Sequence, residues 1–298
     1  MTESKLAVCS WGIYTDQFAN AADLTATVQA QSDAPVRSNS ADTDHALTTD
    51  PDLDSALQGL DSISQYAFRA LHDAQPDRDT AMLKRAGLLL LSTWGPMDNT
   101  VSFLDSMLEA QGRYASPRHF TRSVYSTVAS HAAIYFGIHG PCETLTHGQW
   151  PVCALLDRAA DLLASHRVDH VIACWADQAS KIAKDLCRRG VTALHRHEFS
   201  RFTSDETGYG AVAVVLKRPE KATGSQIILE IPNTNTADPC SDASLDIHSF
   251  PTDRAVRLAA SIATAKLGSG KSPICFTETD PRGRSRIVRL TPKSRHAQ

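Results

Sequence analysis

The chain has 298 residues, of which 42% are hydrophobic, so it contains enough apolar material to bury a large core. Its formal net charge is −3 with acidic and basic residues intermixed, and no basic block is long enough to neutralise a phosphate backbone. The composition therefore argues against overall disorder and against nucleic acid as the main partner.

The cysteines and the apolar runs bear on the cellular compartment. The seven cysteines are an odd number without a C-x-x-C pair, and several lie in apolar stretches, where free thiols behave as small hydrophobes. No stretch approaches the roughly 18 apolar residues that a membrane span needs, and the first residues lack a long apolar region of the secretory type. We therefore expect a reduced, cytoplasmic protein without a membrane span.

The first third of the chain alternates expected strands and helices. Residues 5–14 read as an opening strand, and residues 31–52 form a polar tract rich in Ser, Asp, Thr and Pro that we expect to be a loop. Residues 53–72 carry apolar side chains at the spacing of one helix face. The uniformly apolar run 87–91 is typical of a strand that is buried on both faces.

The rest of the chain carries apolar runs separated by turns that contain Gly or Pro. Pro151 stands near the start of one such run, where its ring pre-sets the first helical turn. The middle is predicted to hold a turn at 92–97, a helix through Val101, Leu104, Met107 and Leu108, a helix after Ser116-Pro117, short strands at 134–138 and 144–146, and a helix from Pro151 through Leu163. The end is predicted to hold strands at 168–175, 211–216 and 227–231, helices at 180–188 and 252–267, and a hairpin of 274–277 with 285–290. Strands that alternate with helices indicate an α/β layered domain.

Several stretches follow one another in a characteristic order: Ser116-Pro117, the run 129–141 (ASHAAIYFGIHGP), Thr144, the helix from 150, the strand 168–173 and the run 208–216 (GYGAVAVVL). In this order they resemble the β-ketoacyl synthase branch of the thiolase-like superfamily, and the likeness runs from residue 5 to about residue 225. It implies a single thiolase-like domain over residues 1–298 with a layered α/β/α fold. Because that fold is normally duplicated, it also implies that residues 217–298 are a shortened C-terminal half.

In this frame the position of the synthase nucleophile is Gln149, nine residues after Gly140. A carboxamide has no thiolate form, whereas acyl condensation needs a sulfur whose pKa is lowered at a helix N-terminus. The family also uses two histidines in its C-terminal half, but residues 217–298 contain only His248 and His296, and neither lies in a His-Gly-Thr context. The resemblance therefore implies a ketosynthase-like subunit that has no catalytic residue of its own.

The resemblance implies a chain-length-factor-type protein that pairs with an active β-ketoacyl synthase in bacterial polyketide, aryl-polyene or specialised fatty-acid biosynthesis. The substrate would arrive on the phosphopantetheine arm of an acyl carrier protein, and no bound cofactor or metal is expected. Two protomers of this fold pair across a strand that corresponds to residues 140–146. The candidates for the substrate tunnel and the interface are His119, Phe120, Ser123, Val124, Cys142, Thr144 and Gln149.

Alternatives stay open at this point. Gln149 either fills the space of the lost nucleophile or donates hydrogen bonds to a thioester carbonyl. Cys142 and Cys153 are the nearest sulfurs, but the first precedes a strand and the second lies inside a helix, which disfavours both as substitute nucleophiles. The alternative function is a malonyl-carrier-protein decarboxylase or an acyltransferase of the same superfamily, and a homodimeric ligand-binding protein is a third possibility.

Two further patterns imitate known sites. His195 and His197, with Glu198 beside them, are spaced as metal ligands on one face of a strand would be, but a third and a fourth ligand are not evident, so we expect these residues to cap a strand edge. Residues 268–272 (GSGKS) imitate a phosphate loop, but Ala265 stands where the first glycine of that motif is required. We therefore expect neither a metal nor a nucleotide site.

Overall fold

The computed structural model describes residues 4–15, 18–33, 50–75, 79–146, 150–178, 210–222, 226–231, 251–267, 273–279 and 285–292. The strands are β1 (Ser4–Thr15), β2 (Ala86–Ser92), β3 (Cys142–Thr146), β4 (His170–Asp177), β5 (Gly210–Lys217), β6 (Ile227–Ile231), β7 (Ile274–Thr279) and β8 (Ser285–Pro292). The helices are α1 (Ala21–Asp33), α2 (Pro51–Leu57), α3 (Ser62–Asp73), α4 (Thr80–Lys84), α5 (Met97–Glu109), α6 (Pro117–Ser123), α7 (Thr127–Phe136), α8 (Pro151–Ala164) and α11 (Pro251–Leu267), with a short 3₁₀ turn η2 (Pro219–Lys221).

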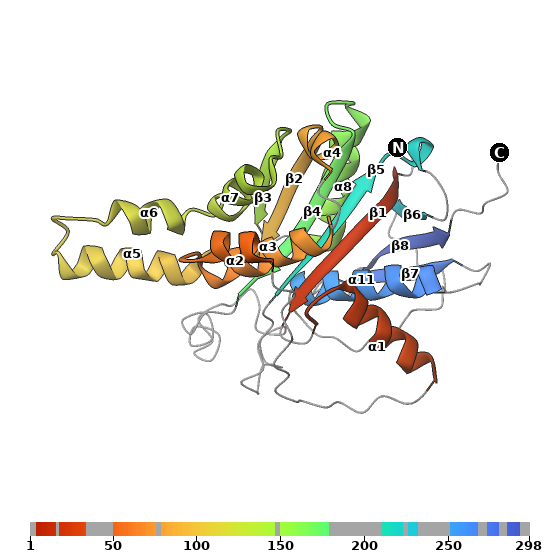
Figure 1. Ribbon diagram of the computed structural model, residues 1–298, viewed down its shortest axis with the longest axis horizontal. Coiled ribbons are helices and arrows are strands. Elements are labelled where there is room, and N and C mark those ends of the chain that lie inside the picture. The colour runs from red at the N-terminus through yellow and green to blue at the C-terminus, as the bar shows by residue number, and fades with distance from the viewer. Residues whose placement is uncertain are drawn as a thin grey trace.

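All eight strands form one mixed sheet in the order β3-β2-β4-β5-β1-β6-β8-β7 (Figure 1). The strands β3, β2 and β4 run parallel to one another, and every other neighbouring pair is antiparallel. The strands β2, β4 and β5 are buried along almost their whole length, as strands covered on both faces are. The short strand β3 and the strand β7 form the two edges.

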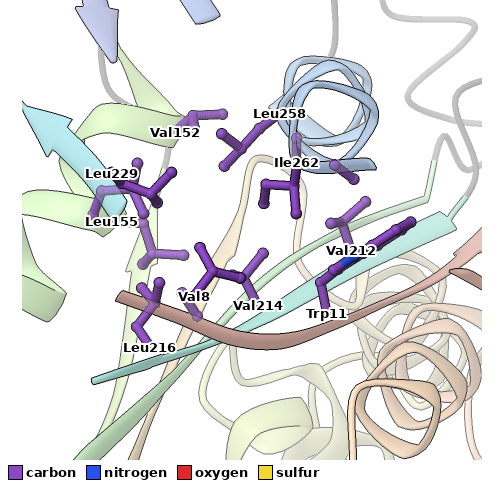
Figure 2. Close-up of a cluster of buried hydrophobic side chains, with 14 of the residues drawn as sticks. Val8, Trp11, Val152, Leu155, Val212, Val214, Leu216, Leu229, Leu258 and Ile262 are labelled. Carbon is purple, nitrogen blue, oxygen red and sulfur yellow. The ribbon is translucent and has the colours of Figure 1, made fainter. Parts of the chain in front are cut away.

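Helices cover both faces of the sheet, which gives the α/β/α layers that the sequence predicts. The helices α8 and α11 pack on one face, and α3 and α7 pack on the other. Figure 2 shows the core on the face covered by α8 and α11, where side chains of these two helices meet residues of β1, β5 and β6. The labelled residues are Val8, Trp11, Val152, Leu155, Val212, Val214, Leu216, Leu229, Leu258 and Ile262.

The opposite face of the sheet is built for close helix packing. On β5, Ala211 and Ala213 alternate with the valines of the other face and point toward α3. Their small side chains leave room for this helix. On β1, a Cβ added to Gly12 would overlap the backbone of Ala70 and Ala74 at the end of α3. Glycine is therefore needed at this position because the helix backbone lies directly against the strand.

Most of the predicted elements are confirmed. The strands expected at 5–14, 87–91, 144–146, 168–175, 211–216 and 227–231, the hairpin of 274–277 with 285–290, and the helices that begin near 97, 117, 151 and 252 all occur. After Lys217 the described chain adds only η2, three strands and α11, which extend the same sheet. The predicted helix 180–188 lies outside the described residues.

Two predictions of local structure are wrong, and a third is wrong at its two ends. The single helix expected over 53–72 is two helices, because Gly59 takes a left-handed φ of 73° and Asp61 caps the next helix through its side chain. The strand expected at 134–138 is the end of α7, which Gly137 stops at a φ of 70°. The polar tract 31–52 is partly helical, since α1 extends to Asp33 and α2 starts at Pro51, whereas residues 34–49 lie outside the described part.

Two findings bear on the expected compartment. Within the described residues, no helix is both long and apolar enough to cross a membrane. Cys9, Cys142, Cys153 and Cys174 are free thiols, but Cys275 on β7 is disulfide-bonded. The expectation of fully reduced cysteines is therefore wrong for Cys275, because an odd count and a missing C-x-x-C motif say nothing about cysteines that pair at long sequence distance.

Candidate functional site

The strand β3 is an edge strand whose outer side has no strand partner in the described part of the chain. It pairs in parallel with β2 on its inner side, from Leu88 with Cys142 to Ser92 with Thr146. An unpaired edge presents a row of N–H and C=O groups that can pair with a second chain. The strand is only five residues long and half-buried. A partner strand would therefore accept and donate the hydrogen bonds of its outer edge and bury its partly exposed side chains.

The side chains of β3 are held from the inside. Arg158 on α8 donates to both carboxylate oxygens of Glu143, at 2.7 and 2.6 Å, and this hydrogen bonding lowers the pKa of Glu143. Such bidentate pairs are geometrically specific. The hydroxyl oxygen of Thr144 is buried without a hydrogen-bond partner among the described residues. Cys142 is exposed, and partial burial of its thiol together with Glu143 raises its pKa.

The helices α5 and α6 form an arm that extends beyond the rest of the molecule (Figure 1). They pack against each other, with the rings of Phe103 and Phe120 5.5 Å apart. The described large apolar side chains with high exposure lie almost all on this arm and on α7; they are Leu104, Leu108, Tyr114, Phe120, Val124 and Ile134, with Leu267 the exception. Exposed apolar side chains that gather on neighbouring elements are typical of an interaction surface.

The sequence-predicted site residues fall into two groups. His119, Phe120 and Ser123 lie on α6, and Val124 is its C-terminal cap, so the structure does bring these four together. Phe120 and Val124 are 54% and 42% exposed, whereas the Nδ1 atom of His119 is buried without a partner in the described region. Cys142 and Thr144 lie on β3, and α7 packs against both α6 and β3. Gln149 lies outside the described residues.

The base of the arm is fixed by a buried carboxylate that the sequence analysis missed. Asp177, at the end of β4, accepts hydrogen bonds from the hydroxyl of Ser92 at 2.9 Å and the amide of Thr93 at 2.7 Å. The hydroxyl of Tyr125, just beyond α6, donates to the carbonyl of Thr93 at 3.2 Å. Both ends of the arm therefore meet at the turn that follows β2. Burial raises the pKa of Asp177 to about 6.

The N-terminus of α8 is the second site that sequence reasoning missed in part. Trp150 is the N-cap but its side chain does not cap the helix by a hydrogen bond, and Pro151 starts the helix. The amides of Val152 and Cys153, which have no acceptor within the helix, donate instead to the carboxylate of Glu278 on β7, at 3.1 and 2.9 Å. A carboxylate that arrives from 125 residues further along the chain carries no local sequence signal.

Neither neighbouring thiol is activated. Cys153 is buried in the core, and burial together with the carboxylate of Glu278 raises its pKa well above the usual value. The pKa of Cys142 is also raised. A reactive cysteine needs the opposite shift.

The remaining patterns are not tested by the structure. His195, His197, Glu198, His248, His296 and residues 268–272 all lie outside the described residues. Within the described ranges, no group of three or more His, Cys, Asp or Glu side chains is placed to hold a metal ion.

Comparison with solved structures gives the fold. The chain is similar to the ishigamide ketosynthase/chain length factor, at 16% identity and a TM-score of 0.69, with 98% of this chain and 100% of that chain covered. It is also similar to a chain in the complex of a type II polyketide synthase acyl-carrier protein with its ketosynthase bound to the hexaketide. The identity is 12% and the TM-score 0.65, with 98% of this chain and 100% of that chain covered. A third similar structure is a ketosynthase in complex with its chain length factor from Xenorhabdus doucetiae, at 13% identity and a TM-score of 0.58 over 96% and 99%.

These similarities confirm the layered α/β/α fold, which the chain shares with these ketosynthase and chain-length-factor structures. Neither a protein-family model nor a curated protein matches the sequence.

Proposed function

We propose that this protein is a non-catalytic, chain-length-factor-type subunit that pairs with an active β-ketoacyl synthase and helps to shape the tunnel for the growing acyl chain. The single observation that carries this proposal is that the outer edge of β3 has no strand partner among the described residues, while α7 links this strand to the apolar arm by packing against both β3 and α6. Two of the similar structures are described as a ketosynthase with a chain length factor, which supports a partner of this same fold.

The chemistry near α8 supports the non-catalytic part of the proposal. The family resemblance assigns Gln149 to the nucleophile position, and a carboxamide does not attack a thioester. Cys142 and Cys153 have raised pKa values, so neither is poised as a thiolate. The condensing sulfur and its histidines would come from the partner, and an acyl carrier protein would present the substrate on its phosphopantetheine arm. One similar structure is an acyl-carrier protein in complex with its ketosynthase.

The proposed interface is tested by placing a charge on its apolar surface. Leu108 on α5 is 75% exposed, and a Leu108→Asp variant should fold but fail to co-purify with a co-expressed synthase, because a charge without a partner is costly at an interface. Leu267→Asp is the matched control, since Leu267 is 45% exposed but lies at the end of α11, far along the chain from the arm. If both variants bind the synthase as the wild type does, the arm is not the interface.

The proposed tunnel is tested by the length of the product. Phe120→Ala and Val124→Ala should lengthen the acyl product of the reconstituted pair by at least one extension unit, because each removes apolar volume from the proposed wall. Tyr114→Ala is the control, because Tyr114 is an exposed aromatic residue in the loop between α5 and α6. Unchanged product lengths in both tunnel variants, measured by mass spectrometry, contradict a role of α6 in the tunnel.

The alternative of a decarboxylase or acyltransferase makes a different prediction. Such an enzyme would convert malonyl-carrier protein to acetyl-carrier protein, or take up an acyl group, without a partner. The isolated chain should do neither, as intact-mass measurement of both proteins after incubation will show. An adduct on the chain, or acetyl-carrier protein above the level of a chain-free control, would contradict the proposed function.

A further inference from the structure

The N-terminus of α8 is occupied by a carboxylate from the C-terminal part of the same chain. Glu278 lies on β7, next to the end of that strand, and its side chain is fully buried. Its two oxygens divide between two consecutive amides: Oε1 accepts from Val152 and Oε2 accepts from Cys153. These are amides of the first helical turn, which have no acceptor within the helix.

A helix N-terminus of this kind attracts negative charge from any source. Its free N–H groups and the helix dipole together favour an anion or the oxygen of a polarised carbonyl. We propose that Glu278 is a built-in anion that fills this end of α8 and excludes acyl, thioester and carboxylate groups from it. The inference does not depend on the proposed partner, because it concerns contacts within one chain.

The surrounding charges fit a permanent occupant. Arg254 on α11 lies 3.6 Å from Oε1 of Glu278, so a cation from the C-terminal part offsets the buried charge. Arg286 on β8 binds both carboxylate oxygens of Asp157 on α8, at 2.7 and 3.2 Å, and its guanidinium lies 5.9 Å from the centre of the Trp150 ring. Three C-terminal elements, α11, β7 and β8, therefore hold the first turns of α8.

The first turn of α8 is fixed from the sheet side as well. The indole N–H of Trp175 on β4 donates to the carbonyl of Pro151 at 3.3 Å, and both residues are buried. With Glu278 at the amides and Trp175 at the carbonyl, the helix end is closed by contacts within the protein. An external acyl group would have to displace a buried, ion-paired carboxylate to reach it.

The same carboxylate, together with burial, keeps the nearest buried sulfur, that of Cys153, in its thiol form. Burial is the largest cause of the raised pKa of Cys153, and Glu278 adds to it both by its charge and by hydrogen bonding. A helix N-terminus would ordinarily lower the pKa of a thiol. Here the amides at the helix N-terminus donate to Glu278 and not to the thiol of Cys153, so this terminus does not generate a thiolate.

The test is to remove the side chain and offer a small carboxylate in its place. In the full-length Glu278→Ala variant, sodium formate should raise Tm saturably by about 3 °C over sodium chloride at the same ionic strength. Wild-type protein should show no such difference. The matched control is Glu230→Ala on β6, which removes a glutamate that is partly exposed and pairs with Lys5 at 2.7 Å. If Glu278→Ala responds no more to formate than Glu230→Ala does, the proposal is overturned.

A second variant covers the case in which Glu278→Ala does not fold. Glu278→Gln keeps the size of the side chain but replaces one acceptor oxygen by a donor, so one of the two amides loses its partner. Hydrogen exchange at Val152 or Cys153 should then be about tenfold faster than in wild type, while protection elsewhere in α8 is unchanged. Equal exchange in both proteins contradicts the proposal. Since both tests use the isolated chain, their failure leaves the proposed pairing with a synthase untouched.

Discussion

The carboxylate of Asp177 offers a prediction whose magnitude and sign follow from the structure. Its Oδ1 atom accepts from the hydroxyl of Ser92 and from the amides of Thr93 and Trp94, at 2.9, 2.7 and 3.3 Å, whereas Oδ2 accepts from the hydroxyl of Thr93 at 3.3 Å. An Asp177→Asn variant can keep its carbonyl oxygen at the Oδ1 position. The substitution therefore removes the charge and preserves the stronger acceptor contacts.

Burial is the main cause that raises the pKa of Asp177 from 3.8 to about 6, against the lowering effect of its hydrogen bonds. Between these two values the folded protein holds a proton that the unfolded chain has released, so the contribution of Asp177 to stability falls as the pH rises. A shift of about two pKa units corresponds to about 3 kcal/mol, reached in full above about pH 6. Asparagine is neutral throughout and escapes this loss.

Urea unfolding of both proteins across this pH range measures the effect. Relative to wild type, Asp177→Asn should be near neutral at about pH 4 and more stable by about 3 kcal/mol at about pH 7. Asp177→Ala is the control for the acceptor, and it should cost about 3 kcal/mol even at low pH, because the donors of Ser92 and Thr93 lose their partner. A difference between Asp177→Asn and wild type that is constant over the whole range would refute this reasoning.

The remaining predictions concern the edge strand and the end of α8. In Gly140→Ala the new Cβ would overlap the carbonyl oxygen of Ala86 on β2, so the segment before β3 should shift. We expect this variant to lose about 2 kcal/mol of folding stability and to bind the synthase more weakly in a pull-down. Gly137→Ala, where a Cβ meets open space, should lose only about 1 kcal/mol for its left-handed φ and leave binding intact; equal binding by both variants would argue against β3 as the pairing edge. Arg218→Met should cost about 3 kcal/mol in urea unfolding, because its Nη1 donates to two backbone carbonyls, whereas Lys221→Met, at an exposed ion pair, should cost less than about 1 kcal/mol. Similar losses in these last two variants would contradict the role given to the buried guanidinium.

The strands of the sheet were predictable because their signals are local. Runs such as 87–91 and 211–216 are apolar without interruption, and only a strand covered on both faces or a buried helix accommodates such a run. The same ambiguity explains the error at 134–138, where an apolar run that looks like a strand is the last turn of a helix. What decides between the two is Gly137, whose left-handed φ ends α7 and is not readable from the run itself.

The candidate site residues could be named only because the family resemblance supplied an order of motifs, and their role stays a prediction. His119, Phe120, Ser123 and Val124 fall on one short helix and its C-terminal cap because they are neighbours in sequence. Asp177 and Glu278 were missed because each acts on a segment about 80 or more residues away, and no local pattern marks a carboxylate that caps a distant turn or helix. Contacts of this range depend on the register of the sheet, which a single sequence does not specify.

The position of β1 has a consequence for how the chain is made. This strand is synthesised before every other described strand, yet its two neighbours in the sheet are β5 and β6, with Val8 opposite Leu216 and Leu6 opposite Leu229. At about 5–20 residues per second, about 200 residues take roughly 10–40 s to synthesise, and during this time the apolar first strand has neither neighbour. The nascent chain must therefore keep β1 from aggregating until β5 and β6 have emerged, and a fragment that stops before residue 210 has no means of completing the sheet.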